Sequence, residues 1–155
     1  MIRLATAEDA HLVHKVMLSA FEEYRHMDVP SGALSETASS IEDSLRNGSE
    51  KALLYYLDEV PVGTVRFKTD NKSLYFFRLS VCPEVRRKGI AKSMLAWLET
   101  YAKEHGLKEI WCRVRMSIPE NIRLYESVGY IISNEEVVTN INGIPVKTVV
   151  MKKEV

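Results

Sequence analysis

The sequence predicts an α+β protein in which helices flank a mixed, mostly antiparallel central sheet of about seven strands. The spacing of apolar residues changes along the chain from helical to alternating and back to helical, as expected when helices and strands contribute to one core. Three strand-like segments between residues 52 and 81 follow one another with short turns, which favours an antiparallel meander. No repeat, linker or low-complexity tract interrupts the 155 residues, so we expect a single domain over residues 1–155.

A short strand and two helices are predicted first. Residues 2–5 alternate like a strand, and Thr6 can cap the following helix with Asp9 in the capping-box position. Apolar residues at helical spacing carry this helix to about Arg25. The remaining elements of this part are a loop at residues 28–32 and a helix over residues 35–46 that ends at Asn47-Gly48.

The rest of the chain predicts six strands and two helices. Segments rich in β-branched and aromatic residues indicate the meander, and a long helical pattern that ends at Gly106 follows it. A further strand, a short helix with proline in its first turn and a closing hairpin over Asn142-Gly143 complete the chain. The expected ranges are strands 52–57, 60–67 and 74–81, helix 89–105, strand 110–114, helix 119–128, and strands 130–139 and 146–151.

Composition and charge exclude several classes of partner. Lys plus Arg and Asp plus Glu are both 21, so no excess positive field exists to bind nucleic acid. Apolar runs are too short for a membrane span, and no signal-peptide pattern begins the chain. Cys82 and Cys112 have no metal or redox spacing, and the four histidines have no zinc spacing. We therefore expect a cytoplasmic protein with reduced thiols, no metal, no nucleic-acid partner and no membrane partner.

The most informative segment runs from Leu79 to Ala91. A strand ends near Val81, Pro83 stops its pairing, and three basic residues precede a helix that starts close to Gly89. Free N–H groups and the positive end of the dipole make such a helix start a site for pyrophosphate, and Gly89 lets a phosphate approach the backbone. Basic side chains at a helix N-terminus are unfavourable without an anion, so they indicate that an anion binds there.

The sequence of this segment does not match two other kinds of phosphate-binding loop. A P-loop needs a second glycine followed by Lys-Ser or Lys-Thr, which Gly89 does not provide. A dinucleotide fingerprint needs two further glycines, but Ala91 and Met94 occupy those positions and the preceding strands form a meander.

The hexapeptide Arg86-Arg87-Lys88-Gly89-Ile90-Ala91 resembles the [QR]-x-x-G-x-[GA] motif of the GCN5-related N-acetyltransferase (GNAT) superfamily. The order of elements over nearly the whole chain is similar to that acyl-CoA N-acyltransferase fold. The resemblance implies acetyl-CoA as cosubstrate, with its pyrophosphate held by Arg86 and by the backbone amides from Arg87 to Ala91. It also implies that the main chain of Leu79 and Val81 pairs with the pantetheine arm. The implied cofactor-binding residues are Leu79, Val81, Arg86, Arg87, Lys88, Gly89, Ile90, Ala91, Ser93 and Asn121.

A second motif, from Asn121 to Tyr130, resembles the late helix of the same family, which commonly ends in LYxxxGF. The resemblance implies that Tyr125 lies near the thioester sulfur and acts as general acid, because amine attack expels a thiolate that an O–H group can protonate. The alternative for Tyr125 is a half-buried aromatic residue with a satisfied hydroxyl.

The chain departs from the family pattern in two places. Many members carry an asparagine seven residues before the tyrosine; Ile118 stands there, and Asn121 either replaces that contact or supports the helix start. Some members also carry a glutamate base on the strand matching residues 74–81, where Arg78 is the only charge. The base is then a water relay or one of Glu22, Glu23 and Glu120.

These observations predict an N-acetyltransferase that passes the acetyl group directly to a primary amine of a small molecule, peptide or protein, because no Cys-His or Ser-His pair is visible. The alternatives are an acyl-CoA sensor without turnover and an acyltransferase for longer acyl-CoA. Valine and isoleucine on both faces of the closing hairpin motivate a homodimer. Acidic residues near the expected acceptor site, which could attract a cation, are Glu22, Glu23, Asp28 and Glu36.

Overall fold

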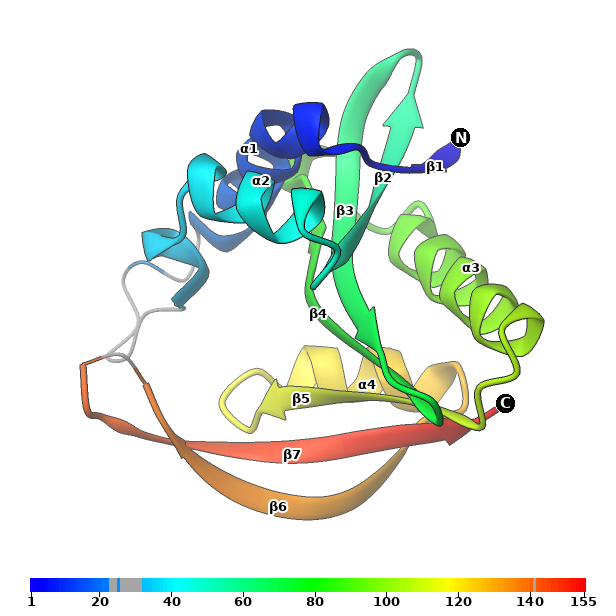
Figure 1. Ribbon diagram of the computed structural model, residues 1–155. Helices are drawn as coiled ribbons and strands as arrows, with labels where there is room; N and C mark the ends of the chain where they lie inside the picture. The colour runs from blue at the N-terminus through cyan, green and yellow to red at the C-terminus, as the bar shows by residue number, and fades with distance from the viewer. Residues whose placement is uncertain (23–24, 26–31, 141) are drawn as a thin grey trace. The chain divides into compact units, whose positions relative to one another are not determined.

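The computed structural model describes residues 1–22, 25, 32–140 and 142–155, and its elements follow the predicted order (Figure 1). The strands form one seven-stranded sheet in the order β1-β2-β3-β4-β5-β7-β6. The pair β4–β5 is parallel, whereas β1–β2, β2–β3, β5–β7 and β6–β7 are antiparallel. The predicted fold class, a mixed and mostly antiparallel sheet with flanking helices, is therefore confirmed.

The element bounds agree with the predicted ranges to within a few residues. The strands are β1 (Ile2–Leu4), β2 (Lys51–Leu57), β3 (Val60–Thr69), β4 (Ser73–Val81), β5 (Glu109–Arg115), β6 (Ile131–Thr139) and β7 (Pro145–Glu154). The helices are α1 (Ala10–Phe21), α2 (Ala38–Arg46), α3 (Ile90–Glu104) and α4 (Pro119–Ser127), with short 3-10 turns η1 (Ala7–Asp9), η3 (Gly32–Ser35) and η4 (Pro83–Val85).

The chain forms two compact units. The first comprises residues Met1–Lys68 and Phe76–Leu98, and the second comprises Thr69–Tyr75 and Glu99–Val155. In the first unit, α1 and α2 lie on one side of β2 and β3, and α3 lies on the other (Figure 1). Both faces of these strands are thus covered, which explains why β3 is buried at six consecutive residues.

Alternation along β3 assigns side chains to the two faces of the first unit. Gly63 lies under α3, where a Cβ atom would be 3.1 Å from side-chain atoms of Ile90 and Met94. Phe67 on the same face has its ring centroid 6.1 Å from that of Trp97 of α3. Arg66 points to the other face, toward α1 and α2. The core on that face contains Ala10, Val13, Met17, Ala33, Ile41, Ala52 and Leu54.

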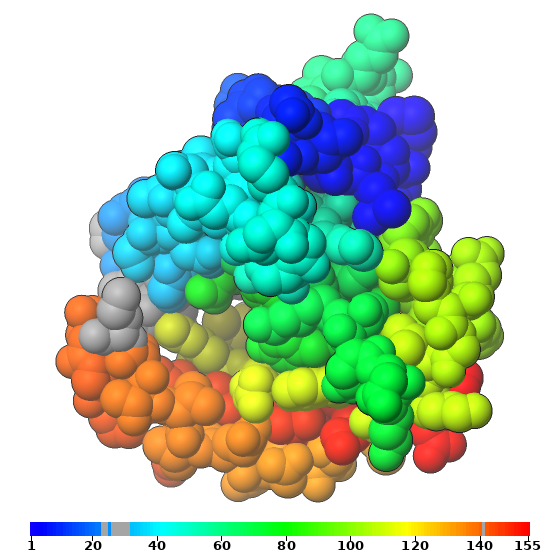
Figure 2. Space-filling view, in the orientation of Figure 1, coloured from blue at the N-terminus to red at the C-terminus, as the bar shows by residue number. Residues whose placement is uncertain are grey.

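The second unit is built around β5, which pairs with β4 through Ser73–Tyr75 and with β7 along its whole length. Its side chains alternate: Ile110, Cys112 and Val114 are buried, whereas Trp111 and Arg113 are partly or fully exposed. β6 pairs with β7 and is the edge strand of the sheet on the side opposite β1, and Figure 2 shows it (orange) at the molecular surface.

Two predicted helix boundaries differ from the structure or lie outside its described part. α2 begins at Ala38 rather than at Ser35, because Thr37 caps it by accepting a hydrogen bond from the N–H of Ser40 at 3.1 Å. Residues Gly32–Ser35 form η3 instead. α1 ends at Phe21, and the stretch toward the predicted end at Arg25 includes two residues outside the described part, as does most of the loop predicted at residues 28–32.

Candidate active site

The segment that sequence analysis singled out forms a continuous strand, turn and helix in the first unit. β4 ends at Val81, and the N–H of Cys82 donates to the carbonyl of Val62 at 2.8 Å. Pro83 is the first residue of η4. The fixed φ and missing N–H of this proline end the strand pairing. Four residues, Arg86 to Gly89, then lead into α3, so the basic loop immediately precedes the helix N-terminus.

Two residues of this loop have left-handed backbone conformations. Arg87 has φ of 67° and Gly89 has φ of 78°. A left-handed φ at arginine is unfavourable, and such residues turn backbone N–H groups toward a common concavity that suits an anion. A Cβ atom built on Gly89 would meet nothing within 4 Å, so the space beside this glycine is open. The loop therefore combines strain with an uncovered backbone at the start of a helix, whose first-turn N–H groups have no intrahelical acceptor.

The side chain of Arg86 donates hydrogen bonds to backbone carbonyls of the protein. Its Nε donates to the carbonyl of Val81 at 3.3 Å, and its Nη2 donates to the carbonyl of Ala20 at 3.2 Å. Ala20 belongs to the last turn of α1, so Arg86 connects that turn and the end of β4 to the basic loop. Arg87 and Lys88 are exposed.

The start of α3 is held by Ser93. Its backbone N–H and its hydroxyl both donate to the carbonyl of Gly89, each at 2.9 Å. The Ile90 side chain is buried, whereas Ala91 and Ser93 are partly or fully exposed. The hydroxyl predicted to contact the cofactor thus also fixes the left-handed glycine.

Arg78 interrupts the regular conformation of β4. Its φ is 55°, and the hydroxyl of Ser80 donates to its carbonyl at 3.0 Å. Leu79 and Val81, which follow it, are both half-buried, while Ser80 between them is buried. A single left-handed residue in a strand re-aims its side chain, and such irregularities are frequent beside active sites.

An ion-pair cluster formed by Glu36, Glu50, Arg66 and Arg78 lies next to this strand. Glu36 accepts from Nη2 of Arg66 through one oxygen and from Nε of Arg78 through the other, both at 2.6 Å. Arg66 also donates to Glu50 at 3.2 Å. Burial raises the pKa of Glu36, but the two arginines outweigh it, so this pKa lies below its ordinary value.

The acidic residues that sequence analysis placed near an acceptor site are therefore not equivalent. Glu36 is neutralised by two arginines. Glu22 is exposed and pairs with Arg25, three residues later in the sequence. Glu23 and Asp28, like His26, lie outside the described residues. Two of the four expected cation-attracting carboxylates thus already have cationic partners.

Tyr125 and Asn121 lie on α4 in the second unit. The Tyr125 side chain is buried, with 7% of the residue exposed, and its ring centroid is 5.9 Å from that of Tyr130. Asn121 is half-buried and donates its N–H to the carbonyl of Ile118 at 3.2 Å, which places it in the first turn of the helix. Glu120 beside it is exposed.

The end of α4 is fixed by Lys153 of β7. Its Nζ donates to the carbonyl of Val128 at 2.7 Å and to Glu99 at 2.9 Å. Gly129 has φ of 100°, and a Cβ atom there would be 3.3 Å from the Lys153 side chain. The helix that carries Tyr125 is thereby attached to the central strands of its unit.

Cys112 lacks the features of an activated nucleophile. Burial raises the pKa of Cys112 to about 12, so its thiol stays protonated at neutral pH. Cys82 is half-buried at the end of β4.

Across residues 1–22, 25, 32–140 and 142–155, no group of three or more His, Cys, Asp or Glu side chains gathers that could hold a metal ion. None of the helices in this part of the chain is long and apolar enough to cross a membrane.

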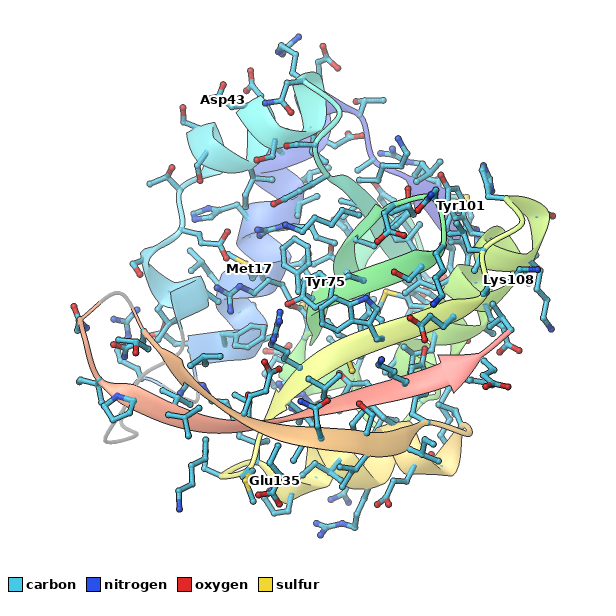
Figure 3. The ribbon with its side chains drawn as sticks, turned by 60° about the horizontal axis from the view of Figure 1, so that its bottom comes forward. Met17, Asp43, Tyr75, Tyr101, Lys108 and Glu135 are labelled. Atoms are coloured by element: carbon cyan, nitrogen blue, oxygen red, sulfur yellow. The ribbon has the colours of Figure 1, made fainter. Side chains whose placement is uncertain are left out.

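Half-buried Trp111 belongs to a cluster of side chains on one sheet face of the second unit. The rings of Tyr75, labelled in Figure 3, and Trp111 have centroids 4.4 Å apart. The guanidinium of Arg113 lies 4.9 Å from the Trp111 ring and also pairs with Glu136 at 3.1 Å. These residues share one sheet face because β4 and β5 pair in register at Tyr75 and Trp111.

Comparison with known proteins gives a family match and several relatives. The model of the acetyltransferase (GNAT) family matches residues 14–130. The chain is 28% identical over 154 residues to the uncharacterized protein YyaT of Bacillus subtilis, covering 99% of this chain and 94% of that protein. It is 33% identical over 54 residues to the ribosomal protein bS18-alanine N-acetyltransferase of Escherichia coli, covering 35% of this chain and 36% of that enzyme.

Solved structures share the fold. A GNAT-family acetyltransferase from Streptococcus pneumoniae superposes with a TM-score of 0.77 at 19% identity, covering 100% of this chain and 99% of that chain. A GNAT-family acetyltransferase from Elizabethkingia anophelis, solved with acetyl-CoA bound, has a TM-score of 0.74 at 17% identity, covering 100% and 97%. At such identities the likeness establishes the fold.

Proposed function

Because the chain belongs to the acetyltransferase (GNAT) family, and is therefore an N-acetyltransferase, we propose that it uses acetyl-CoA and transfers the acetyl group directly to a primary amine. The observation that carries this proposal is the basic loop before α3, in which left-handed Arg87 and Gly89 leave an open backbone at a helix N-terminus. The acceptor is a small molecule, a peptide or a protein amine.

In this proposal the cofactor lies along β4 and the basic loop. The N–H groups from Arg87 to Ala91 bind the pyrophosphate, with Lys88 adding charge. The main chain of Leu79 and Val81 pairs with the pantetheine arm as an added strand would. Arg86 acts chiefly by holding the loop, since its guanidinium already donates to the carbonyls of Val81 and Ala20. The remaining proposed contacts come from Ile90, Ser93 and Asn121.

The chemistry follows from the balance of bonds and protons. The neutral amine nitrogen attacks the thioester carbon, forming a C–N bond, and the C–S bond then breaks. Before the attack the ammonium gives one proton to Glu22, Glu23, Glu120 or a water relay. Tyr125 donates its hydroxyl proton to the departing thiolate, and the second proton, which the nitrogen releases as the amide forms, returns to the Tyr125 phenolate through water. Direct transfer is favoured over a covalent enzyme intermediate because the thiol of Cys112 is held protonated by burial.

Two alternatives keep the same cofactor loop: a sensor that binds acyl-CoA without turnover, and an acyltransferase for longer acyl chains. One experiment separates them. The protein is incubated with acetyl-CoA or longer acyl-CoA and a broad panel of amines, and release of free coenzyme A is followed. Amine-dependent release of coenzyme A from acetyl-CoA supports the proposal. Binding of acetyl-CoA without release for any amine would support the sensor instead. Faster release from a longer acyl-CoA would support the acyltransferase for longer acyl chains.

Several further expectations belong to this proposal. We propose a cytoplasmic protein with one domain over residues 1–155, without a metal and without a nucleic-acid or membrane partner. The balanced charge of 21 basic and 21 acidic residues supports the absence of nucleic-acid binding. The proposed homodimer rests on β6, which is exposed along most of its length.

A further inference from the structure

The side chain of Arg78 stands at an irregular position of β4. Its left-handed φ of 55° is rare for a residue other than glycine, asparagine or aspartate, and nothing in a regular strand requires it. Such a conformation persists only where surrounding contacts hold it, and it is concentrated at functional sites. Here Ser80 holds the carbonyl and Glu36 holds the guanidinium.

Within the described residues, the Arg78 guanidinium makes its hydrogen bond through the Nε edge alone. Its Nε donates to Glu36 at 2.6 Å, and in the part of the chain that the structure describes its terminal nitrogens have no hydrogen-bond acceptor. The side chain is 31% exposed, whereas that of Arg66, which shares Glu36, is only 5% exposed. A Cβ atom at Gly32 would be 3.3 Å from Nη2 of Arg78, so the glycine leaves room beside this terminus.

The position of Arg78 relative to the proposed cofactor follows from the direction of the strand. With pyrophosphate at Arg87–Ala91, a pantetheine arm that pairs first with Val81 and then with Leu79 runs back along β4. Its sulfur end therefore lies near Arg78. The amine that attacks the thioester must approach this same end, so a half-exposed guanidinium there faces the acceptor.

We propose that Arg78 binds a carboxylate of the acceptor, which makes the substrate an amine that carries a carboxylate close to its nitrogen, as an α-amino acid does. This inference rests on the proposed function. The terminal nitrogens of a guanidinium bind carboxylate with two parallel hydrogen bonds, and Glu36 orients the group from its other edge. Glu36 and Glu22 already have cationic partners, so the described residues offer a purely cationic acceptor less attraction than the sequence suggested.

The test compares matched acceptors. Amino acids and their amides are supplied with acetyl-CoA, and kcat and KM are measured from free thiol release, corrected to equal concentrations of neutral amine. We expect the wild-type protein to favour the carboxylate over the amide at least about tenfold in kcat/KM. In Arg78→Gln the KM for the carboxylate acceptor should rise about 10- to 100-fold. The ratio of kcat/KM for the carboxylate to kcat/KM for the amide should then approach one.

Control variants separate recognition from folding. Glu36→Gln removes the carboxylate that orients the Arg78 guanidinium but keeps the guanidinium itself, so the preference for the carboxylate acceptor should fall less than in Arg78→Gln. Arg46→Gln, at an exposed residue of α2, should leave the ratio unchanged. Arg78→Lys keeps the charge without the two-pronged geometry and should recover only part of the preference. If Arg78→Gln unfolds, Arg78→Lys still tests the guanidinium, because it should show only part of the preference for the carboxylate that Arg46→Gln keeps in full.

The outcomes also distinguish this inference from the function on which it rests. Equal turnover of amides and amino acids by the wild-type protein, or a preference that survives in Arg78→Gln, would overturn the role of Arg78 while leaving amine acetylation intact. Binding of acetyl-CoA without thiol release for any amine would instead reject the proposed function, and the inference with it.

Discussion

Gly89 and Gly48 have almost the same backbone conformation, with φ of 78° and 79°, and a Cβ atom at either would meet nothing within 4 Å. Substitution by glutamate should therefore cost both positions a similar strain, about 1–2 kcal/mol. Only Gly89→Glu places bulk and negative charge where we propose that pyrophosphate binds. We expect it to lower acetyl-CoA affinity by about a hundredfold or more, measured by calorimetry.

Gly48→Glu is the matched control for this prediction, since it follows α2 and lies outside the proposed site. It should lose a similar amount of stability and keep its affinity for acetyl-CoA. Undiminished affinity in Gly89→Glu would mean that the basic loop is not the pyrophosphate site.

Tyr125 is the residue that separates an enzyme from a sensor. If its hydroxyl protonates the departing thiolate, Tyr125→Phe should lower kcat roughly a hundredfold, equivalent to about 2.7 kcal/mol, with little change in acetyl-CoA affinity. The ring is retained, so its contact with Tyr130 should survive and the melting temperature should change little. Single-turnover and steady-state kinetics measure the effect.

Tyr130→Phe provides the comparison, because Tyr130 is equally buried and follows the same helix. Burial raises the pKa of the Tyr130 hydroxyl above the ordinary value, so this hydroxyl stays protonated at neutral pH. Turnover should persist in Tyr130→Phe. Full turnover in Tyr125→Phe would assign that hydroxyl to the core, and lost cofactor affinity would make Tyr125 a binding residue.

Single residues also mark the limit of prediction from sequence. The glycine at position 89 indicates a left-handed conformation from the sequence alone, because a positive φ costs glycine little free energy. Arg78 and Arg87 adopt the same region although arginine does not favour it, and for Arg78 one of the contacts that hold it comes from Glu36, 42 residues away. The basic charge of Arg86 was visible, but its bonds to the carbonyls of Val81 and Ala20 were not.

At the level of elements, the segment from η3 to α2 depends on one carboxylate. Glu36 directly precedes Thr37, the N-cap of α2, and its ion pairs fasten this segment to β3 and β4. The sequence predicted a helix over the right region because its apolar spacing is local information. The predicted start of the helix was wrong because Thr37 rather than a residue before Ser35 is the N-cap, and the ion pairs of Glu36 were not predictable because its partners are 30 and 42 residues away.

The lowered pKa of Glu36 predicts a pH dependence of stability. The folded protein holds the carboxylate more strongly than the unfolded chain does, so its contribution is present above the unfolded pKa, near 4.5, and is lost as pH falls through the lower folded pKa. Glu36→Gln should reduce the free energy of unfolding by about 1–3 kcal/mol at pH 7, and by less near pH 3. Urea unfolding at both pH values measures this.

Other carboxylates with lowered pKa, such as Asp9 and Glu99, remain in both proteins and therefore cancel in this comparison. A constant difference between wild type and Glu36→Gln from pH 7 to pH 3 would contradict the ion-pair account of Glu36.

At the level of the whole molecule, the edge strand β6 favours association with a second copy of the chain. β6 has nine residues, and Ile131 and Val137 are 68% and 64% exposed. An exposed edge strand with apolar side chains readily pairs with another chain. We predict a homodimer through β6 at micromolar concentration, so light scattering should give about twice the 17.7 kDa of one chain.

The double substitution Ile131→Lys and Val137→Lys should convert this dimer to monomer. Val60→Lys, at a similarly exposed valine of β3, is the control and should leave the mass unchanged. A wild-type mass of 17.7 kDa would rule out the dimer.

The order of all the elements and the family were predictable from the sequence, because both depend on local periodicity and on two short motifs. The cluster of Glu36, Glu50, Arg66 and Arg78 was not, because its members come from a turn before one helix, a loop and two strands. The sequence therefore located the proposed cofactor loop and missed the arginine that we assign to the acceptor.

We predict that cofactor and acceptor affinities are thermodynamically linked through the two hydrogen bonds of Arg86. Its guanidinium joins the loop proposed for pyrophosphate to the last turn of α1, after which the chain enters the segment expected to form the acceptor site. If cofactor binding shifts this guanidinium, the factor by which acetyl-CoA changes the acceptor's dissociation constant must equal the factor by which the acceptor changes that of acetyl-CoA. Breaking the bridge with Arg86→Met would bring both factors toward one together.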